Sequence, residues 1–310
     1  MVHVPPFGRL LTAMVTPFTD DGELDHDGAA ALATALVDEL GNDGLVISGT
    51  TGEAPTTTDA EKAELLGVVV DAVGDRCQVV AGVGTCSTEH TLSLAAAAEK
   101  AGAAGLLVVT PYYSRPPQSG LLLHFRAVAD GTGLPIMLYD IPHRAGVPIA
   151  TETLLTLAEH PRIVAVKDAK GDLPATSAVL ATTDLAYYSG DDAMTLPLLS
   201  VGAVGVVGTS THFTGRGMKE LIEAYLAGDP ARALALHRRL LPAFTGVFAT
   251  QGCILVKAGL KLQGRGNGRL RSPMPGATQE QTAALATALA AVGLPTNPSA
   301  DQTLRTRTNP

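Results

Sequence analysis

Short apolar segments alternate with longer amphipathic segments along most of the chain. Eight of the short segments are rich in Val, Leu, Ile and Ala, and most end in Gly, Ser, Thr or Pro, a pattern typical of strands buried on both faces. We expect these strands at residues 10–15, 44–48, 78–82, 105–110, 136–139, 163–167, 186–189 and 204–208. A helix-like segment follows each of them, at residues 27–40, 58–73, 88–101, 119–130, 151–160, 174–182, 193–201 and 214–227.

The order of these segments predicts the fold. Eight strand-then-helix units indicate an α/β protein of the (β/α)8 TIM barrel type, in which parallel strands close on themselves. An open, doubly wound sheet is the alternative, but no Gly-x-Gly-x-x-Gly motif follows the first strand. Thr58 and Glu61 support the second helix, because they have the spacing of a capping box.

The pattern becomes purely helical after residue 228. Helices are expected at residues 231–248, 253–262 and 279–292. We therefore predict a catalytic barrel at residues 1–228 and a small C-terminal helical region at residues 229–294. Residues 295–310 are polar and contain Pro and Asn, so we expect a disordered tail there.

Composition narrows the class of protein. With 310 residues, 46% hydrophobic and 17% charged, the chain has the make-up of a globular enzyme or carrier. Its net charge of -8 and lack of a basic run argue against a nucleic-acid partner. We expect neither a signal peptide nor a membrane span, because no apolar run is long enough. Three cysteines without metal-binding spacing favour a cytoplasmic location and no metal site.

A lysine closes one of the expected buried strands. Side chains alternate along a strand, so Ile163, Ala165 and Lys167 are expected on one face. If that face points into the barrel, Ala165 leaves space beneath the amine, and apolar surroundings lower the lysine pKa from roughly 10.4. A neutral amine can form a Schiff base with a ketone. The alternative is a lysine that reaches solvent or pairs with Asp168, and we favour this alternative when the Val-Lys-Asp segment is considered without the rest of the chain.

Other strand ends carry polar groups where barrel enzymes place their chemistry. The second strand is followed by the segment 48–53, SGTTGE, whose glycines and hydroxyls suit a carboxylate or phosphate, or form an ordinary capped turn. Tyr113 follows the fourth strand and Tyr139 is at the end of the fifth, and a phenol at either position can transfer protons. Arg144 can bind a carboxylate or, alternatively, pair with Glu53 or an aspartate.

Two adjacent acids follow the seventh strand. Asp191 and Asp192 could bind a metal or could lie at a solvated helix N-terminus, which favours negative charge. No third ligand has a matching spacing, so we prefer the helix terminus. We interpret His143, His212 and Cys86 as loop or core residues, because no partner for them can be identified.

Together these motifs resemble the dihydrodipicolinate synthase family, within the pyruvate-dependent class I aldolases. The motifs that carry the resemblance are GTTGE at 49–53, PYYSRP at 111–116, YDIPHRAG at 139–146, VKDAKGD at 166–172 and SGDD at 189–192. The similarity runs from about Phe7 to Leu262, in order and with family-like spacing.

The resemblance implies how the first substrate is bound. Lys167 is expected to form an imine with pyruvate, while Thr51 holds the pyruvate carboxylate. Gly190 and Val207 match backbone positions that line the pyruvate pocket. No cofactor and no metal are expected.

The resemblance also implies a proton relay and a second substrate. Tyr139 is expected to donate and accept protons over the imine, relayed through Thr50 to Tyr113 of a neighbouring subunit. Arg144 is expected to receive the carboxylate of aspartate semialdehyde. The implied partners are therefore pyruvate, aspartate semialdehyde and further copies of the chain, as a dimer or tetramer.

The implied reaction is the condensation that yields 4-hydroxy-tetrahydrodipicolinate, in diaminopimelate and lysine biosynthesis. A sister aldolase of the 2-keto-3-deoxy sugar acid or sialic acid lyase type is an alternative, disfavoured by Arg144 with Tyr113. A second alternative is a non-catalytic barrel that binds keto acids. It is disfavoured because Lys167 and Tyr139 are both present. Lys62 and His90 stand where some members bind inhibitory lysine through a His and a Glu, so we predict weak or absent feedback.

Overall fold

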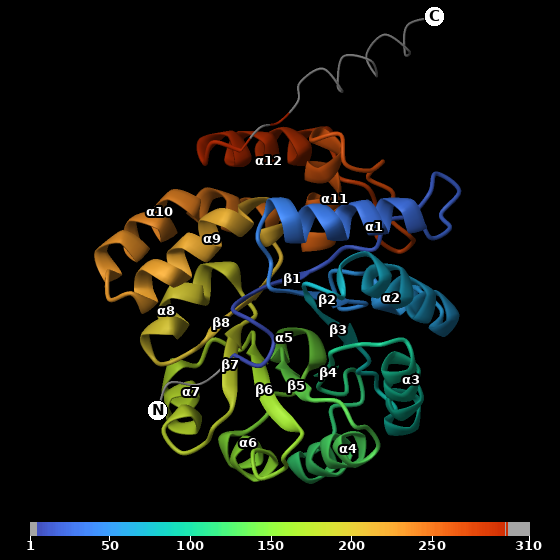
Figure 1. Cartoon of the computed structure of the whole chain (residues 1–310), viewed down its shortest axis with the longest axis vertical. Coiled ribbons are helices and arrows are strands. Elements are labelled where there is room, and N and C mark those ends of the chain that lie inside the picture. The colour runs from blue at the N-terminus through green and yellow to red at the C-terminus, as the bar shows by residue number, and fades with distance from the viewer. Residues whose placement is uncertain (1–4, 295, 297–310) are drawn as a thin grey trace, which may run out of the picture.

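Eight parallel strands form a closed barrel in a computed structural model that describes residues 5–294 and 296 (Figure 1). Each strand pairs with its neighbours in sequence, and β1 pairs with β8 to close the barrel. The strands are β1 (Leu10–Ala13), β2 (Gly44–Ile47), β3 (Gln78–Gly82), β4 (Gly105–Val109), β5 (Ile136–Asp140), β6 (Ile163–Asp168), β7 (Ala186–Ser189) and β8 (Gly205–Gly208). The predicted TIM barrel is therefore confirmed, with strand ends shifted by at most two residues.

Most helices surround the barrel on its outer side, whereas the four-residue helix after β5 lies over the centre of the barrel in this view (Figure 1). The helices are α1 (His26–Thr34), α2 (Asp59–Val73), α3 (Thr88–Lys100), α4 (Gln118–Asp130), α5 (Pro142–Ala145), α6 (Thr151–Leu157), α7 (Leu173–Leu180), α8 (Thr195–Ser200) and α9 (Thr211–Leu226). Short segments add a π-helical turn, η1 (Ala35–Glu39), and the 3-10 turns η2 (Ala54–Thr56) and η3 (Asp192–Met194). The capping box at the start of α2 is present, with Thr58 and Glu61 each accepting from the other's backbone N–H. Helix α5 was not predicted, because four residues are too short to show periodicity.

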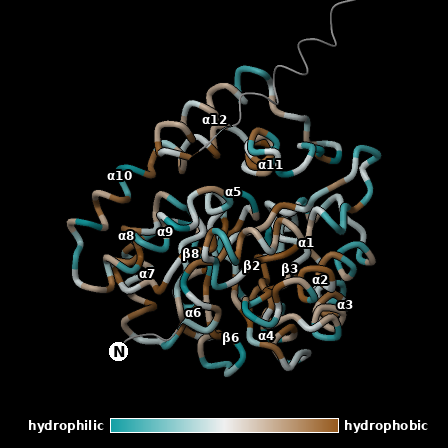
Figure 2. The backbone as a smooth tube through the Cα atoms, turned by 45° about the horizontal axis from the view of Figure 1, so that its top comes forward, coloured by the Kyte–Doolittle hydropathy of each residue, from teal (hydrophilic) through white to brown (hydrophobic). Residues whose placement is uncertain are grey.

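Two apolar layers stabilise the barrel. Side chains that point inward fill its interior, including Leu11, Val46, Leu107, Ala165 and Val207. Side chains that point outward pack against the helices, and Figure 2 shows this hydrophobic character around β3 and α2. Inward-facing and outward-facing side chains alternate along each strand, and both kinds are apolar. The strands therefore appear in the sequence as continuous apolar runs.

The start of β6 departs from the predicted alternation. Ala165 lies in the barrel interior as expected, but Ile163 belongs to the outer layer. The expectation that Ile163 shares the face of Lys167 is therefore wrong. The register between β5 and β6 shifts here, from Ile136 opposite Ile163 to Met137 opposite Ala165, and this irregularity interrupts the two-residue repeat.

The C-terminal part of the described chain is helical, as predicted. It consists of α10 (Pro230–Val247), α11 (Gly252–Leu262) and α12 (Gln279–Ala291), and α11 and α12 lie together at one side of the barrel in both views (Figure 1, Figure 2). Leu240 and Phe244 of α10 pack with Leu221 of α9, which attaches this region to the barrel. The expected disordered tail at 295–310 lies outside the described residues, apart from residue 296.

No single described helix has the length and apolar character needed to cross a membrane. Helices α10 and α11 satisfy those two criteria only as a pair, and the chain bends by 107° between them.

Candidate active site

The amine of Lys167 lies at the carboxyl end of β6, inside the barrel mouth. The register places Lys167 opposite Tyr139 on β5 and opposite Tyr188 on β7. Its side chain is only 5% exposed, and Nζ lies 4.3 Å from the centroid of the Tyr139 ring. The small side chain of Ala165 lies on the same inner face, two residues earlier.

Burial gives this lysine an unusual protonation state. Desolvation lowers the pKa of Lys167 to about 8, and the Arg144 cation contributes in the same direction, while Asp192 opposes the change. Roughly one amine in ten is then neutral at pH 7, far more than for a solvated lysine. Asp168 does not pair with it, because its carboxylate accepts from the backbone N–H groups of Lys170 and Gly171 and from the Thr176 hydroxyl. The alternative of a strand-end Lys167–Asp168 pair is therefore wrong.

Tyr139 is a buried phenol beside the amine. Burial raises its pKa to about 12, while the Arg144 cation and a hydrogen bond with the Thr50 side chain oppose that shift. The phenol is therefore protonated at neutral pH and can donate. The Thr50 side chain therefore lies near the phenol, and the relay from Tyr139 through Thr50 stays a prediction.

Tyr113 does not reach the other predicted residues within one chain. It is 94% exposed and lies in the loop between β4 and α4, with a left-handed backbone (φ 69°). A large aromatic side chain in such a conformation is uncommon. Its predicted role therefore depends on a second copy of the chain.

The turn after β2 presents Thr50 and Thr51 at the barrel mouth. The Thr51 hydroxyl lies 3.3 Å from the hydroxyl of Thr209, which follows β8. The carbonyl of Gly52 accepts a hydrogen bond of 2.6 Å from the Thr16 hydroxyl. A Cβ atom on Gly52 would lie 3.1 Å from the Met14 carbonyl oxygen, so glycine permits this close approach.

A buried ion pair fixes the end of the same turn. Glu53 and Lys257 are 3% and 4% exposed, and their carboxylate oxygen and amine nitrogen lie 2.5 Å apart. Glu53 also accepts from the Arg271 backbone N–H, while Lys257 donates to the Arg269 carbonyl and lies 4.2 Å from the Phe18 ring centroid. These partners compensate for the loss of hydration of both charges.

Arg144 lies on α5 and points towards the C-terminal region. Its guanidinium donates to Oε1 of Gln251, at 2.8 Å, just before α11. The expected alternative, in which Arg144 pairs with Glu53 or an aspartate, is wrong: among the described residues its guanidinium contacts Gln251, and Glu53 pairs with Lys257. The exposed guanidinium keeps further N–H groups that can bind a carboxylate.

Gly190 comes directly after β7, and Val207 lies within β8. The backbone N–H of Gly190 donates to the Asp168 carbonyl at 2.7 Å, which ties the end of β7 to β6. Val207 is fully buried in the barrel interior and is the register partner of Leu11 on β1. Both positions therefore belong to rigid parts of the barrel.

The two acids after β7 have different environments. Asp191 caps η3 by accepting from the Ala193 N–H, as expected of a helix terminus. Asp192 is fully buried rather than solvated, which corrects the prediction for this residue. Its carboxylate accepts from the Thr209 N–H at 3.0 Å and the Ser210 hydroxyl at 2.7 Å, and burial raises its pKa. These donors come from the β8 loop, which local sequence could not reveal.

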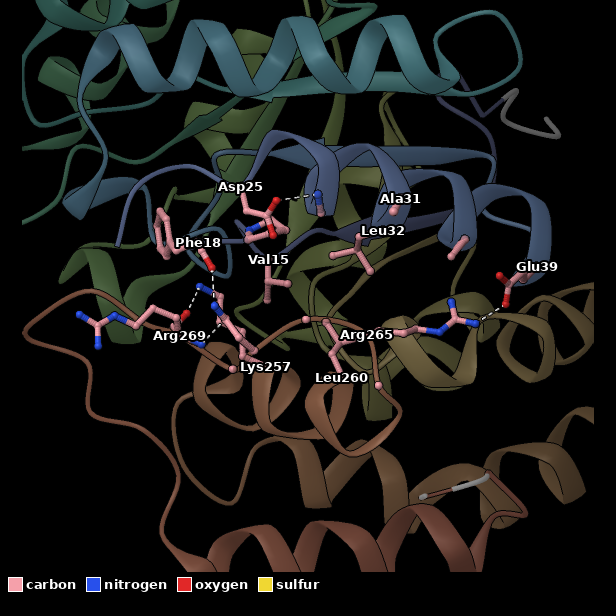
Figure 3. A pocket seen from close by; sticks show the side chains of 17 residues that line it. Val15, Phe18, Asp25, Ala31, Leu32, Glu39, Lys257, Leu260, Arg265 and Arg269 are labelled. Atoms are coloured by element: carbon pink, nitrogen blue, oxygen red, sulfur yellow. Dashed lines mark hydrogen bonds and ion pairs between the residues drawn. The ribbon is translucent and has the colours of Figure 1, made fainter. Parts of the chain in front are cut away.

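A separate cavity of about 360 Å³ lies between α1 and α11 (Figure 3). Leu32 and Leu260 line it together with Phe18, and Arg265 pairs with Glu39 at one end. None of the eight predicted site residues lines this cavity. Among the residues that the structure describes, no cluster of three or more His, Cys, Asp or Glu could hold a metal ion.

Comparisons with known proteins agree on one family. The model of the Dihydrodipicolinate synthetase family matches residues 6–292. A protein of Acidothermus cellulolyticus named 4-hydroxy-tetrahydrodipicolinate synthase is 68% identical, over 93% of each chain. A protein of Streptomyces coelicolor named 4-hydroxy-tetrahydrodipicolinate synthase 2 is 61% identical, over 93% of this chain and 96% of its own.

Solved structures give the same result. The lysine-bound enzyme of Cyanidioschyzon merolae is 42% identical, with a TM-score of 0.91 over 94% of this chain and 99% of its own. The dihydrodipicolinate synthase of Aquifex aeolicus is 35% identical, also with a TM-score of 0.91, over 94% of this chain and 99% of its own.

Proposed function

Because the chain belongs to the dihydrodipicolinate synthetase family, we propose that it condenses pyruvate with L-aspartate 4-semialdehyde to give 4-hydroxy-tetrahydrodipicolinate. The observation that carries this proposal is the Lys167 amine, buried at the end of β6 and 4.3 Å from the centre of the Tyr139 ring. The reaction serves diaminopimelate and lysine biosynthesis, and we assign the enzyme to the cytoplasm.

The first step is formation of an imine. The neutral Lys167 amine attacks the ketone carbon of pyruvate, and the carbonyl oxygen leaves as water. Thr51 donates to the pyruvate carboxylate, and Gly190 and Val207 form the adjacent walls. The protonated imine withdraws electrons, so the methyl group loses a proton and an enamine forms.

Protons reach and leave the imine through Tyr139. A phenol with a pKa near 12 is a weak acid at neutral pH, so it needs a hydrogen-bonded chain to exchange its proton. In the proposed relay, Thr50, whose side chain lies near the Tyr139 phenol, supplies the first link, and Tyr113 of a neighbouring subunit supplies the next. The exposure of Tyr113 supports this role, because a side chain that projects from one copy can enter another. The proposal therefore requires at least a dimer.

The second step forms a carbon–carbon bond. The enamine attacks the aldehyde carbon of aspartate semialdehyde, while Arg144 binds the carboxylate of that substrate. The substrate amine then attacks the imine carbon, closes the ring and releases Lys167 as a free amine. Gln251 holds one nitrogen of Arg144 and so limits the orientations of the guanidinium.

Reductive trapping tests the function. Pyruvate with borohydride should add one reduced pyruvate to Lys167, located by peptide mapping, and a coupled assay should show turnover with aspartate semialdehyde. A Lys167→Arg variant should lose both signals, whereas Lys261→Arg, at an exposed lysine of α11, should keep both. An adduct without turnover would instead favour a sister aldolase, and absence of an adduct would refute the imine mechanism.

A further inference from the structure

Thr209 follows β8, and its hydroxyl group contacts the hydroxyl group of Thr51. Its side chain is 6% exposed, and its Oγ1 lies 3.3 Å from Oγ1 of Thr51. The two residues come from turns after strands that are not neighbours in the barrel, since β1 separates β2 from β8. This contact therefore joins two turns at the barrel mouth.

The backbone of Thr209 is fixed on both sides. Its N–H donates to buried Asp192 at 3.0 Å, and its carbonyl lies 2.8 Å from Nδ1 of His212. The other ring nitrogen of His212 accepts from the Val15 N–H at 3.1 Å, so Nδ1 carries the hydrogen and donates to Thr209. Burial lowers the pKa of His212 to about 4, which keeps this neutral form at physiological pH.

The side chain of Thr209 is also restricted. Its methyl group packs against Gly252, where an added Cβ atom would lie only 3.1 Å from the methyl carbon. Gly252 is the first residue of α11, so the C-terminal region holds the methyl group in place. With the methyl group fixed there, the hydroxyl faces Thr51.

Two neighbouring hydroxyls share one hydrogen bond, in which one donates and the other accepts. If the Thr209 hydroxyl donates to the Thr51 oxygen, the Thr51 hydroxyl keeps its own hydrogen for an external acceptor. Accepting the bond from Thr209 also makes the Thr51 hydroxyl a stronger hydrogen-bond donor. A bound carboxylate favours this arrangement, because hydrogen bonds to an anion are stronger than those between neutral groups.

We propose that Thr209 is a positioning residue that directs the Thr51 hydroxyl to the carboxylate of a 2-oxo acid. This inference rests on the proposed function, in which Thr51 binds pyruvate. Thr209 thereby contributes to selection of 2-oxo carboxylates over ketones that lack the carboxylate.

Thr209→Val tests the proposal, because valine keeps the methyl group and removes the hydroxyl. We expect KM for pyruvate to rise roughly five- to tenfold, the effect of losing one hydrogen bond to an anion-binding group. The turnover number, KM for aspartate semialdehyde and Tm should stay close to those of the wild type. Thr209→Ser keeps the hydroxyl but loses the methyl group that orients it, so its KM for pyruvate should lie between those of the wild type and the Val variant. A KM for Thr209→Val that equals the wild-type value would overturn the proposal.

A double-mutant cycle separates this role from simple packing. Thr51→Val alone should raise KM for pyruvate, and adding Thr209→Val to it should change KM by less than twofold, because the residue acts through Thr51. An equal fold-change in both backgrounds would overturn the proposal. If borohydride traps pyruvate on Lys167 of the wild type but Thr209→Val leaves KM for pyruvate unchanged, only this inference is rejected. If the wild type gives no trapped adduct, the proposed function is rejected as well.

Discussion

The amine of Lys167 lies 4.3 Å from the centre of the Tyr139 ring because the two residues are register partners on β5 and β6. The backbone ladder, rather than a flexible loop, therefore sets the distance between the proposed nucleophile and the proposed proton donor. Small changes in loops after these strands should leave this pair intact.

The pH dependence of imine formation should reflect the pKa of Lys167. Only the neutral amine attacks the ketone, so the rate should rise about tenfold per pH unit below about pH 8 and level off above it. The Tyr139 pKa near 12 keeps the phenol protonated over this range, so it causes no decline. Initial trapping rates between pH 6 and 10 measure the profile, and a rise that continues towards pH 10 would show a solvated lysine.

Mixed oligomers should show whether Tyr113 acts across a subunit interface. Lys167→Arg and Tyr113→Phe should each be nearly inactive as pure proteins. When the two are unfolded together and refolded, sites with Lys167 from one copy and Tyr113 from the other become complete, and activity should return. If Tyr113 acted within its own subunit, mixing would restore nothing. Tyr112→Phe, at the adjacent and less exposed tyrosine, serves as the control.

Loss of Lys257 should destabilise the fold. Lys257→Met leaves the Glu53 carboxylate buried without its cation, which should lower the free energy of unfolding by about 3–5 kcal/mol. Adding Glu53→Gln should recover part of the loss, because the buried charge is then removed. Arg265→Met breaks a more exposed pair with Glu39 and should cost no more than about 1 kcal/mol. Urea denaturation measures the free energy of unfolding of the three variants. A similar loss of stability for Lys257→Met and Arg265→Met would contradict the expectation.

Lysine should inhibit this enzyme weakly or not at all. The Lys62 amine donates to the Thr57 carbonyl, and His90 contacts Asp59 at 2.8 Å, so both residues have partners within the chain. An ammonium group at position 62 also repels a positively charged ligand. Activity assays with submillimolar lysine should show less than half-inhibition. Lys62→His with His90→Glu would be expected to increase sensitivity, and half-inhibition of the wild type would contradict the prediction.

Hydrophobic patterning predicted most of the fold. All eight strands were found because parallel strands buried on both faces appear as short apolar runs between polar turns. The inward face of Ile163 was mispredicted, since a shift in pairing with β5 is a property of two strands and not of one sequence.

The candidate site was predicted only in part. Lys167, Tyr139 and Thr50 carry local signals and lie together, whereas Gln251 and Thr209 were missed. Gln251 meets Arg144 across 107 positions in the sequence, and Thr209 meets Thr51 across 158. Nothing in a short motif indicates such pairs. Lys257 had one usable signal, a single charge inside the apolar helix CILVKAGL.

The buried pair of Glu53 and Lys257 also affects the order of events during synthesis. The two residues are separated by 204 positions, which a ribosome takes roughly 10 to 40 s to translate. Throughout that interval the carboxylate has no lysine partner, so burying it would be unfavourable and the turn bearing Thr50 and Thr51 should stay hydrated. All eight strands, up to the end of β8 at Gly208, are translated before α11, and we expect the turn to pack fully only after Lys257 has emerged.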